Sequence, residues 1–110
     1  MESKVLLVLS TGEKEKALAG LLYATNAIRN KWLSDVRVVF FGPFEKLLSE
    51  DQEVQQVVAM LQDLRTPVAC RYIAEKDRVQ DKLTQLGIDL QYVGETVSTA
   101  IKDGYVPMVF

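Results

Sequence analysis

The sequence predicts an α/β fold: a three-layer α/β/α sandwich around a mostly parallel sheet of about five strands. Short apolar runs alternate with longer segments whose apolar residues recur every three or four positions, which is typical of strands followed by amphipathic helices. The first run, Val5–Leu9, is continuously apolar, as in a strand that is buried on both faces. Such a strand–helix repeat favours parallel pairing, with helices on both faces of the sheet.

The first half of the chain predicts a strand, a long helix, a second strand and a short helix. Lys4–Leu9 is the first strand, and the β-branched and aromatic run Val36–Phe41 is the second, ended by Gly42-Pro43. Residues 13–31 predict the long helix, and residues 44–48 the short one. Side chains at helical spacing form one stripe on the long helix: Leu18, Leu21, Leu22, Thr25, Ile28 and Trp32.

The second half repeats this pattern. We expect helices over 51–64, 75–86 and 96–102, and strands over 67–72, 88–93 and 105–110. Gly87 is expected to end the mostly polar helix before it. Because Pro107 cannot donate a hydrogen bond to a neighbouring strand, the last strand is expected at or near an edge of the sheet.

The composition fits a single domain over residues 1–110 and excludes several classes of function. The chain is 48% hydrophobic and 25% charged with a net charge of −2, so nucleic-acid binding is not expected. It has no histidine and one cysteine, which excludes Ser-His and Cys-His catalysis and an internal disulfide. We expect no metal and no cofactor. Since no apolar run approaches the length of a signal sequence or of a membrane span, we expect a cytoplasmic protein with no membrane partner.

In open α/β sheets, ligands bind beyond the carboxyl ends of the strands. We therefore predict that a substrate would contact residues at or just after the carboxyl ends of the predicted strands: Ser10, Thr11, Gly12, Gly42, Phe44 and Arg71. Gly94 and Glu95 follow the fourth strand but carry no specific prediction.

The loop after the first strand has two interpretations. Its backbone N–H groups could hold an anion at the start of a helix. Alternatively, Ser10, Thr11 and Gly12 form an ordinary turn in which one of the two hydroxyls caps the helix. The loop has neither the GxGxxG nor the GxxxxGK[ST] pattern, so the second interpretation is the simpler one.

Cys70 also has two interpretations. A free cysteine is often a small buried hydrophobic residue. However, Cys70 falls near the carboxyl end of a predicted strand, shortly before a predicted helix. A helix N-terminus and a cation such as Arg71 would both favour the nucleophilic thiolate. Without a histidine or a second cysteine, Cys70 could act only as a carrier or a lone nucleophile.

The whole chain resembles the DsrE/DsrF-like proteins, which are small α/β domains that include sulfur-relay subunits. The resemblance rests on the order of elements and on short segments: Ser10-Thr11-Gly12, Phe40-Phe41-Gly42, Val68-Ala69-Cys70, Gly87-Ile88 and the ending from Lys102 to Phe110. The third-strand cysteine, followed by a helix and the Gly-Ile turn, is the most specific of these features.

The resemblance implies a homo-oligomer, commonly a trimer or hexamer, in which Cys70 carries a persulfide between a sulfur donor protein and an acceptor protein. The alternative is a non-catalytic, homo-oligomeric binding module with a structural Cys70. The reactivity of Cys70 in the folded protein would distinguish these two hypotheses.

Overall fold

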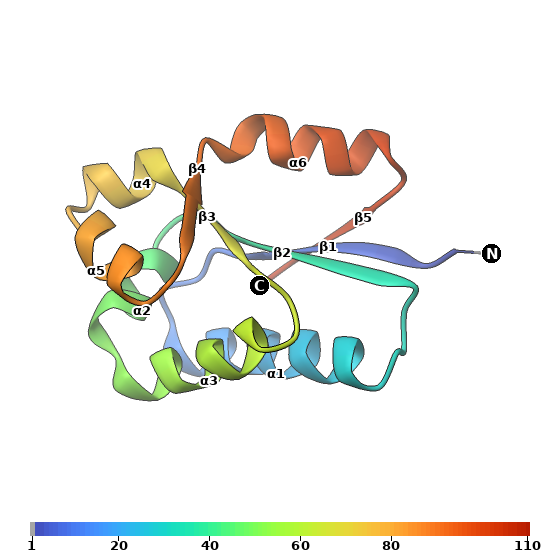
Figure 1. Ribbon diagram of the computed structural model, residues 1–110, viewed down its shortest axis with the longest axis horizontal. Coiled ribbons are helices and arrows are strands. Elements are labelled where there is room, and N and C mark those ends of the chain that lie inside the picture. The colour runs from blue at the N-terminus through green and yellow to red at the C-terminus, as the bar shows by residue number, and fades with distance from the viewer. Residues whose placement is uncertain (1) are drawn as a thin grey trace.

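The computed structural model describes residues 2–110 and contains one five-stranded sheet, in which every pair of neighbouring strands is parallel (Figure 1). The strands are β1 (Lys4–Leu9), β2 (Asp35–Phe40), β3 (Val68–Cys70), β4 (Asp89–Gln91) and β5 (Val106–Val109). Their order in the sheet is β4-β3-β2-β1-β5. The fold class is thus confirmed, and so is the edge position of the strand that contains Pro107.

Helices connect all the strands. They are α1 (Lys14–Arg29), α2 (Phe44–Glu50), α3 (Gln52–Gln62), α4 (Arg71–Lys76), α5 (Gln80–Gln85) and α6 (Val93–Lys102). From β1 the chain steps through β2 and β3 to β4, and α6 then crosses back to place β5 on the other side of β1. Within the described residues, no helix is both long and apolar enough to cross a membrane.

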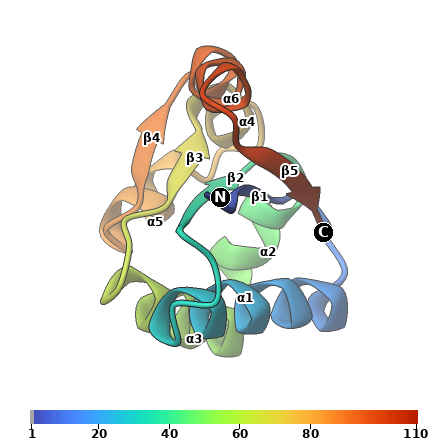
Figure 2. The same cartoon turned by 90° about the vertical axis from the view of Figure 1, so that its right-hand side faces the viewer.

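The helices form two layers and a group at one end of the sheet. Helices α1 and α3 cover one face, while α6 lies over the other (Figures 1 and 2). Helices α2, α4 and α5 gather at the carboxyl end of the strands, at the left of Figure 1. That end is therefore enclosed by three short helices and by the loops that lead into them.

Each face of the sheet has its own apolar core. The larger core lies on the side of α1 and α3 and includes Leu7, Leu21 and Phe40. The smaller core lies on the side of α6 and includes Leu6, Val39, Cys70, Val93 and Ala100. Successive residues of a strand point to opposite faces, and both faces of β1 are buried, as its continuous apolar run predicts.

The structure has two short helices in a region where the sequence predicted one. Instead of a single helix over residues 75–86, α4 and α5 are separated by a turn at Arg78, whose φ is 59°. The N–H of Arg78 donates to Glu75 O and the N–H of Val79 donates to Ala74 O, which is the hydrogen-bond pattern of a Schellman helix end. Left-handed residues are usually glycines, so an arginine at this position gave no signal of a break.

The third strand is shorter than predicted. It stops at Cys70, and Tyr72 belongs to α4 rather than to a strand. Strand β3 pairs with β2 only through Val68 and Ala69, so the chain has little to pair with on that side and turns into a helix. Helix α6 begins at Val93, three residues earlier than expected, so Gly94 and Glu95 are helical rather than part of a loop.

Candidate functional site

The loops that follow β1 and β2 pack directly against one another at the carboxyl end of the sheet. The N–H of Phe44 donates to Ser10 O at 3.0 Å. A Cβ atom at Gly42 would lie 2.7 Å from the Ser10 hydroxyl oxygen, and one at Gly12 would lie 3.1 Å from Pro43 Cβ. Gly42 also has a φ of +111°, which favours glycine. The structure thus brings Ser10, Gly12 and Gly42 together through close packing of the two loops.

Three backbone donors of the first loop, those of Ser10, Thr11 and Glu13, are already occupied. The N–H groups of Ser10 and Thr11 both donate to Phe110 O, at 2.8 and 3.1 Å. The Thr11 hydroxyl accepts a hydrogen bond from the Glu13 N–H at 3.0 Å, and α1 begins at Lys14. These contacts form the predicted turn, but the N-cap residue of α1 is Glu13 and no side chain caps the helix, so the predicted cap by Ser10 or Thr11 is wrong.

Phe44 was predicted to contact a substrate, but it belongs to the core. Its side chain is fully buried, and its ring lies 4.7 Å from that of Phe40, measured between centroids. The ring therefore packs beneath the carboxyl end of the sheet and offers no open surface there.

Cys70 lies at the carboxyl end of β3, as predicted, and directly precedes α4. Its side chain is 5% exposed and packs in the smaller core with Val39 and Val93. The partly buried Ile73, one turn along the chain, packs against the same cluster. Cys70 is thus a buried member of the smaller core.

Arg71 is directed toward β4. Its guanidinium donates to Leu90 O at 3.3 Å and lies 6.0 Å from the centroid of the Tyr92 ring. These partners account for its orientation. The suggestion that Arg71 turns its charge toward the sulfur of Cys70 therefore gains no support from the structure.

Glu45 is a residue of this site that the sequence analysis missed. It is the second residue of α2 and is fully buried. Its carboxyl group faces the backbone N–H groups of Gly42 and Cys70, yet neither oxygen has a partner at hydrogen-bonding geometry among residues 2–110. A charged residue in a short predicted helix is ordinarily solvated, so no sequence signal identified it.

Burial raises the pKa of the Glu45 carboxyl to about 8. The N–H groups of Gly42 and Cys70 oppose this rise, because they stabilise the carboxylate, and the negative charge of Asp77 adds to it. At neutral pH the carboxyl is therefore mostly protonated, which is the form that burial favours.

A cavity of about 220 Å³ lies at this end of the sheet and is lined by Lys46, the residue after Glu45, but not by Glu45 itself. Its walls come from the loop after β2, from α2 and from α4: Gly42, Pro43, Lys46, Ile73, Lys76 and Asp77. Gly42 and Asp77 also act on Glu45, and Ile73 also packs against the cluster that contains Cys70. Neither Glu45 nor Cys70 lines the cavity, but both share these neighbours with it, and we call this region the Cys70 site. The described part of the chain has no cluster of side chains suited to hold a metal ion.

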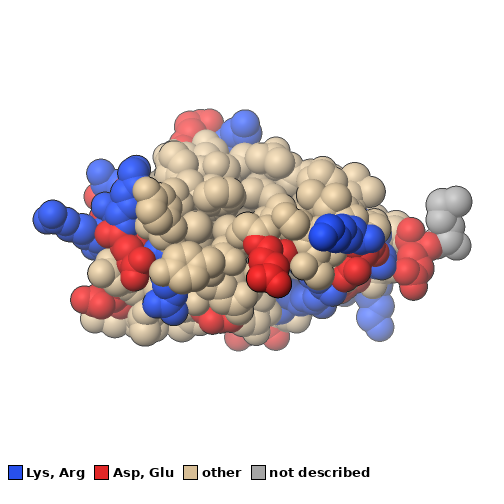
Figure 3. All heavy atoms as spheres, turned by 90° about the horizontal axis from the view of Figure 1, so that it is seen from above, with Lys and Arg blue, Asp and Glu red and all other residues tan. Residues whose placement is uncertain are grey.

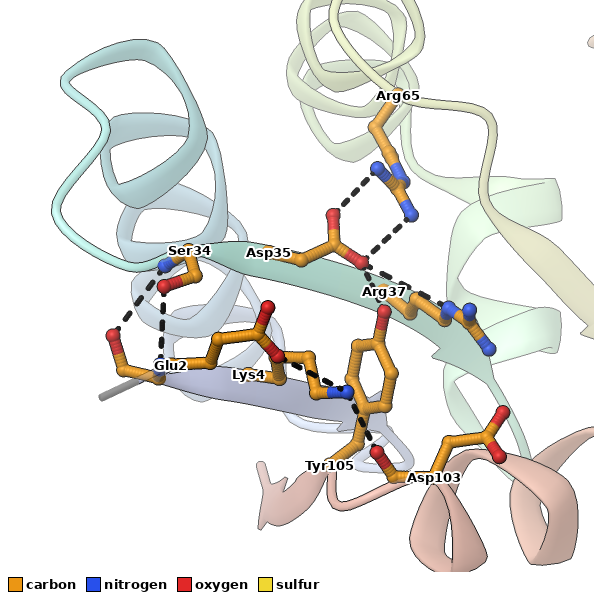
Figure 4. Close-up of polar contacts among 9 residues, drawn as sticks. Glu2, Lys4, Ser34, Asp35, Arg37, Arg65, Asp103 and Tyr105 are labelled. Atoms are coloured by element: carbon orange, nitrogen blue, oxygen red, sulfur yellow. Dashed lines mark hydrogen bonds and ion pairs between the residues drawn. The ribbon is translucent and has the colours of Figure 1, made fainter.

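A second polar cluster lies at the opposite, amino end of the sheet (Figure 4). The Asp35 carboxylate accepts hydrogen bonds from the Arg65 guanidinium at 2.7 and 3.2 Å and from the Tyr105 hydroxyl. Lys4 and Arg37 lie over the Tyr105 ring, 5.0 and 4.3 Å from its centroid.

This cluster joins β1, β2 and the segments that lead into β3 and β5. Burial alone would raise the pKa of Asp35, but the hydrogen bond from Tyr105 and the charge of Arg65 outweigh it and hold the pKa below its usual value. The hydrogen bond to Asp35 raises the pKa of Tyr105. A cavity of about 500 Å³ lies next to Asp35 and Arg65, with Trp32 in its wall. We assign this cluster a structural role, because its charged groups are paired with one another.

Comparisons with known proteins support the fold. No protein-family model and no curated protein matches the sequence. Among solved structures, the chain is similar to BT1422, a conserved protein of unknown function from Bacteroides thetaiotaomicron, with 27% identity and a TM-score of 0.87 over 97% of this chain and 95% of that one. It is also similar to MTH1491, a protein of unknown function from Methanobacterium thermoautotrophicum, with 17% identity and a TM-score of 0.78 over 99% of this chain and 100% of that one. The three chains share one fold over nearly their whole length.

Proposed function

We propose that this protein is a sulfur carrier of the DsrE/DsrF type, in which Cys70 holds a persulfide. The observation that carries the proposal is the position of Cys70. The sole thiol of the chain lies at the carboxyl end of a parallel strand, and Ile73, which packs against the same cluster, lines a cavity. The carboxyl end of an open α/β sheet is where such folds bind their ligands.

The transfer requires only one cysteine. The Cys70 thiolate attacks the terminal sulfur of a persulfide on a donor protein, and a bond forms between Cys70 Sγ and that sulfur. The sulfur–sulfur bond of the donor breaks at the same time, and the donor cysteine leaves as a thiolate that takes up the proton lost by Cys70. Transfer to an acceptor thiol repeats this exchange, so the sequence of steps needs no external oxidant or reductant.

A second candidate function is a non-catalytic, homo-oligomeric binding module in which Cys70 only fills the core. The low exposure of Cys70 and its apolar neighbours favour this alternative.

The surface on the side of α6 also favours the binding module, because Figure 3 shows a broad area there without charged side chains. Large apolar residues are exposed on α4, α6 and β5 and beside β4: Tyr72, Tyr92, Ile101 and Val109. Such surfaces usually mark contacts between proteins, and either candidate function would use them in a trimer or hexamer.

The carrier proposal is tested by incubating the folded protein with a persulfide donor and measuring its intact mass after removal of the donor. We expect a gain of one sulfur atom per chain, which a reducing thiol reverses. Cys70→Ser is the control and should gain no sulfur while keeping the wild-type circular dichroism spectrum. A wild-type protein that gains no sulfur, or a Cys70→Ser variant that gains as much as wild type, would refute the proposal.

A further inference from the structure

Two adjoining cavities lie on the α6 face of the sheet. The smaller one, which we call the arginine cavity, has a volume of about 130 Å³ and lies between β2, β3 and α6. The larger one, the tyrosine cavity, has about 400 Å³ and lies between β2, the end of β4 and α6. Arg37 of β2 and Thr96 of α6 line both cavities, so one ligand can extend from the first into the second.

The walls of the arginine cavity suit an anion. Its floor comes from apolar residues of the smaller core, such as Leu6 and Val39. Its polar side chains are two guanidinium groups and two hydroxyls: Arg37, Arg65, Thr66 and Thr96. Among the described residues that line it, none is acidic. The planar guanidinium matches the oxygens of a phosphate or a carboxylate, and apolar surroundings strengthen such contacts.

The Asp35 carboxylate balances only one of the two guanidinium charges. It accepts hydrogen bonds from Arg65 at 2.7 and 3.2 Å, whereas its ion pair with Arg37 is 3.9 Å long, beyond hydrogen-bonding distance. Figure 4 shows the two arginines approaching Asp35 from different sides. The three groups together carry a net positive charge, and the Arg37 side chain, which is 41% exposed, keeps its N–H donors for a ligand.

The tyrosine cavity suits an uncharged planar group. The Tyr92 side chain, which lines it, is 65% exposed, and aromatic rings stack favourably on such a surface. The amide of Gln91 and the hydroxyl of Thr99 add hydrogen-bonding groups. Glu95 also lines this cavity and would repel an anion there, so the negative charge of a ligand belongs in the arginine cavity.

We propose that the two cavities form one binding site for a nucleoside monophosphate, with the phosphate between Arg37 and Arg65 and the base against Tyr92. A phosphate monoester offers three terminal oxygens, which can accept from both guanidinium groups and a threonine hydroxyl at once. The base is planar and carries hydrogen-bonding edges, as the walls of the tyrosine cavity require. This inference goes beyond the carrier function and does not depend on Cys70.

The test is isothermal titration calorimetry at pH 7 with three probes: AMP, adenosine and inorganic phosphate. We expect one AMP per chain with a Kd below about 1 mM, and roughly tenfold or weaker binding of adenosine and of phosphate, because each fills only one cavity. Arg37→Met removes the unbalanced charge and should weaken AMP binding by roughly tenfold or more. Arg29→Met is the matched control, because Arg29 is exposed at the end of α1 in the opposite layer, and should stay within about twofold of wild type.

A second variant keeps the test informative if Arg37→Met does not fold. Thr96→Val removes the hydroxyl shared by both cavities and should weaken AMP binding by roughly threefold or more.

No AMP binding by wild type, wild-type affinity in the folded variants at positions 37 and 96, or equal losses in Arg37→Met and Arg29→Met would overturn the inference. Adenosine binding as tight as that of AMP would exclude the phosphate contacts, and inorganic phosphate binding as tight as that of AMP would exclude the base contacts. Either result would also overturn the inference. The loading of Cys70 with sulfur is measured separately, so none of these results affects the carrier proposal.

Discussion

Among single residues, Glu45 and Asp35 have opposite electrostatic environments. Glu45 is buried without a partner, and its pKa is raised to about 8. Asp35 is partly buried but paired with Arg65 and Tyr105, and its pKa is lowered. These opposite shifts make opposite contributions to the dependence of stability on pH.

For Glu45, the folded state binds the proton more tightly than the unfolded state. The unfolded carboxyl ionises above its ordinary pKa of 4.5, while the folded one keeps its proton until about pH 8. Its contribution to the free energy of unfolding therefore declines between these pH values, by at most about 1.4 kcal/mol per pH unit. We expect Glu45→Gln to gain stability relative to wild type over this range, by a few kcal/mol in total. Urea denaturation at pH 5 and pH 8 measures this difference, and an equal difference at the two pH values would contradict the assignment.

For Asp35, the stabilising contribution is present above the ordinary pKa of 3.8 and is lost as the pH falls through the lower folded pKa. Tyr105→Phe removes one of the hydrogen bonds that lower it. We expect a loss of about 1 kcal/mol in the free energy of unfolding at pH 7, and a smaller loss below pH 3.8. Tyr92→Phe is the control, because that side chain is 65% exposed. If both variants lose the same stability at pH 7, the Tyr105–Asp35 contact contributes nothing specific.

The sequence indicated Cys70 but not Glu45, for a physical reason. Cys70 ends an apolar run, and the fold class alone places the end of such a run at the ligand-binding edge. The burial of Glu45 depends instead on how α2 packs against α3, α4 and α5. That packing is tertiary and leaves no pattern in residues 44–48. The orientation of Arg71 toward Leu90 depends in the same way on where β4 lies.

At the scale of elements, the helix ends explain where the sequence analysis succeeded and where it failed. Gly87 and Gly104 have positive φ angles at the ends of α5 and α6, and the glycine at position 87 predicted its helix end. Arg78 and Lys31 hold the same kind of position after α4 and α1 without being glycines. The break at Arg78 was missed because it is set by the Schellman hydrogen bonds of the chain and not by a residue that prefers the left-handed conformation.

The positive φ angles at Arg78 and Gly87 predict opposite effects of substitution at these two helix ends. Arg78→Gly should relieve the left-handed strain and stabilise the protein by about 0.5–1 kcal/mol, after the higher entropy of glycine in the unfolded chain is subtracted. Gly87→Ala introduces the same strain and should destabilise it by about 1–2 kcal/mol. Gly94→Ala, in a helix and with open space around its Cβ position, is the control and should not destabilise. Thermal unfolding of the three variants checks the signs, and a destabilised Arg78→Gly would be incompatible with this account.

At the scale of the whole molecule, the strand–helix alternation predicted the sheet and its layers correctly. The pattern is sufficient because a parallel sheet with short crossovers has few possible topologies. The sequence predicted that β5 lies at an edge of the sheet, but not that it lies beside β1 rather than beyond β4. The sequence does not encode the crossing of α6 in any local pattern.

The apolar surface on the side of α6 predicts self-association. Ile101 is 49% exposed on α6, and Ile101→Glu would place a charge on this surface. We expect the wild type to form a trimer or hexamer in multi-angle light scattering, and Ile101→Glu to shift the population toward the monomer. Leu22→Glu is the matched control, because Leu22 is 61% exposed on α1, in the opposite helical layer, and should leave the assembly unchanged. A monomeric wild type at micromolar concentration would count against the oligomer.

The central claim is that Cys70 reacts as part of the folded protein. The most direct test is the rate at which a small thiol reagent modifies Cys70 at increasing urea concentrations, all well below the unfolding midpoint. If Cys70 is a carrier at the edge of the sheet, the rate should be nearly independent of urea, because only local motion around Ile73 and the cavity is needed. If the rate instead rises with urea as steeply as the global unfolding equilibrium, Cys70 is reached only by unfolding, and the carrier account is contradicted.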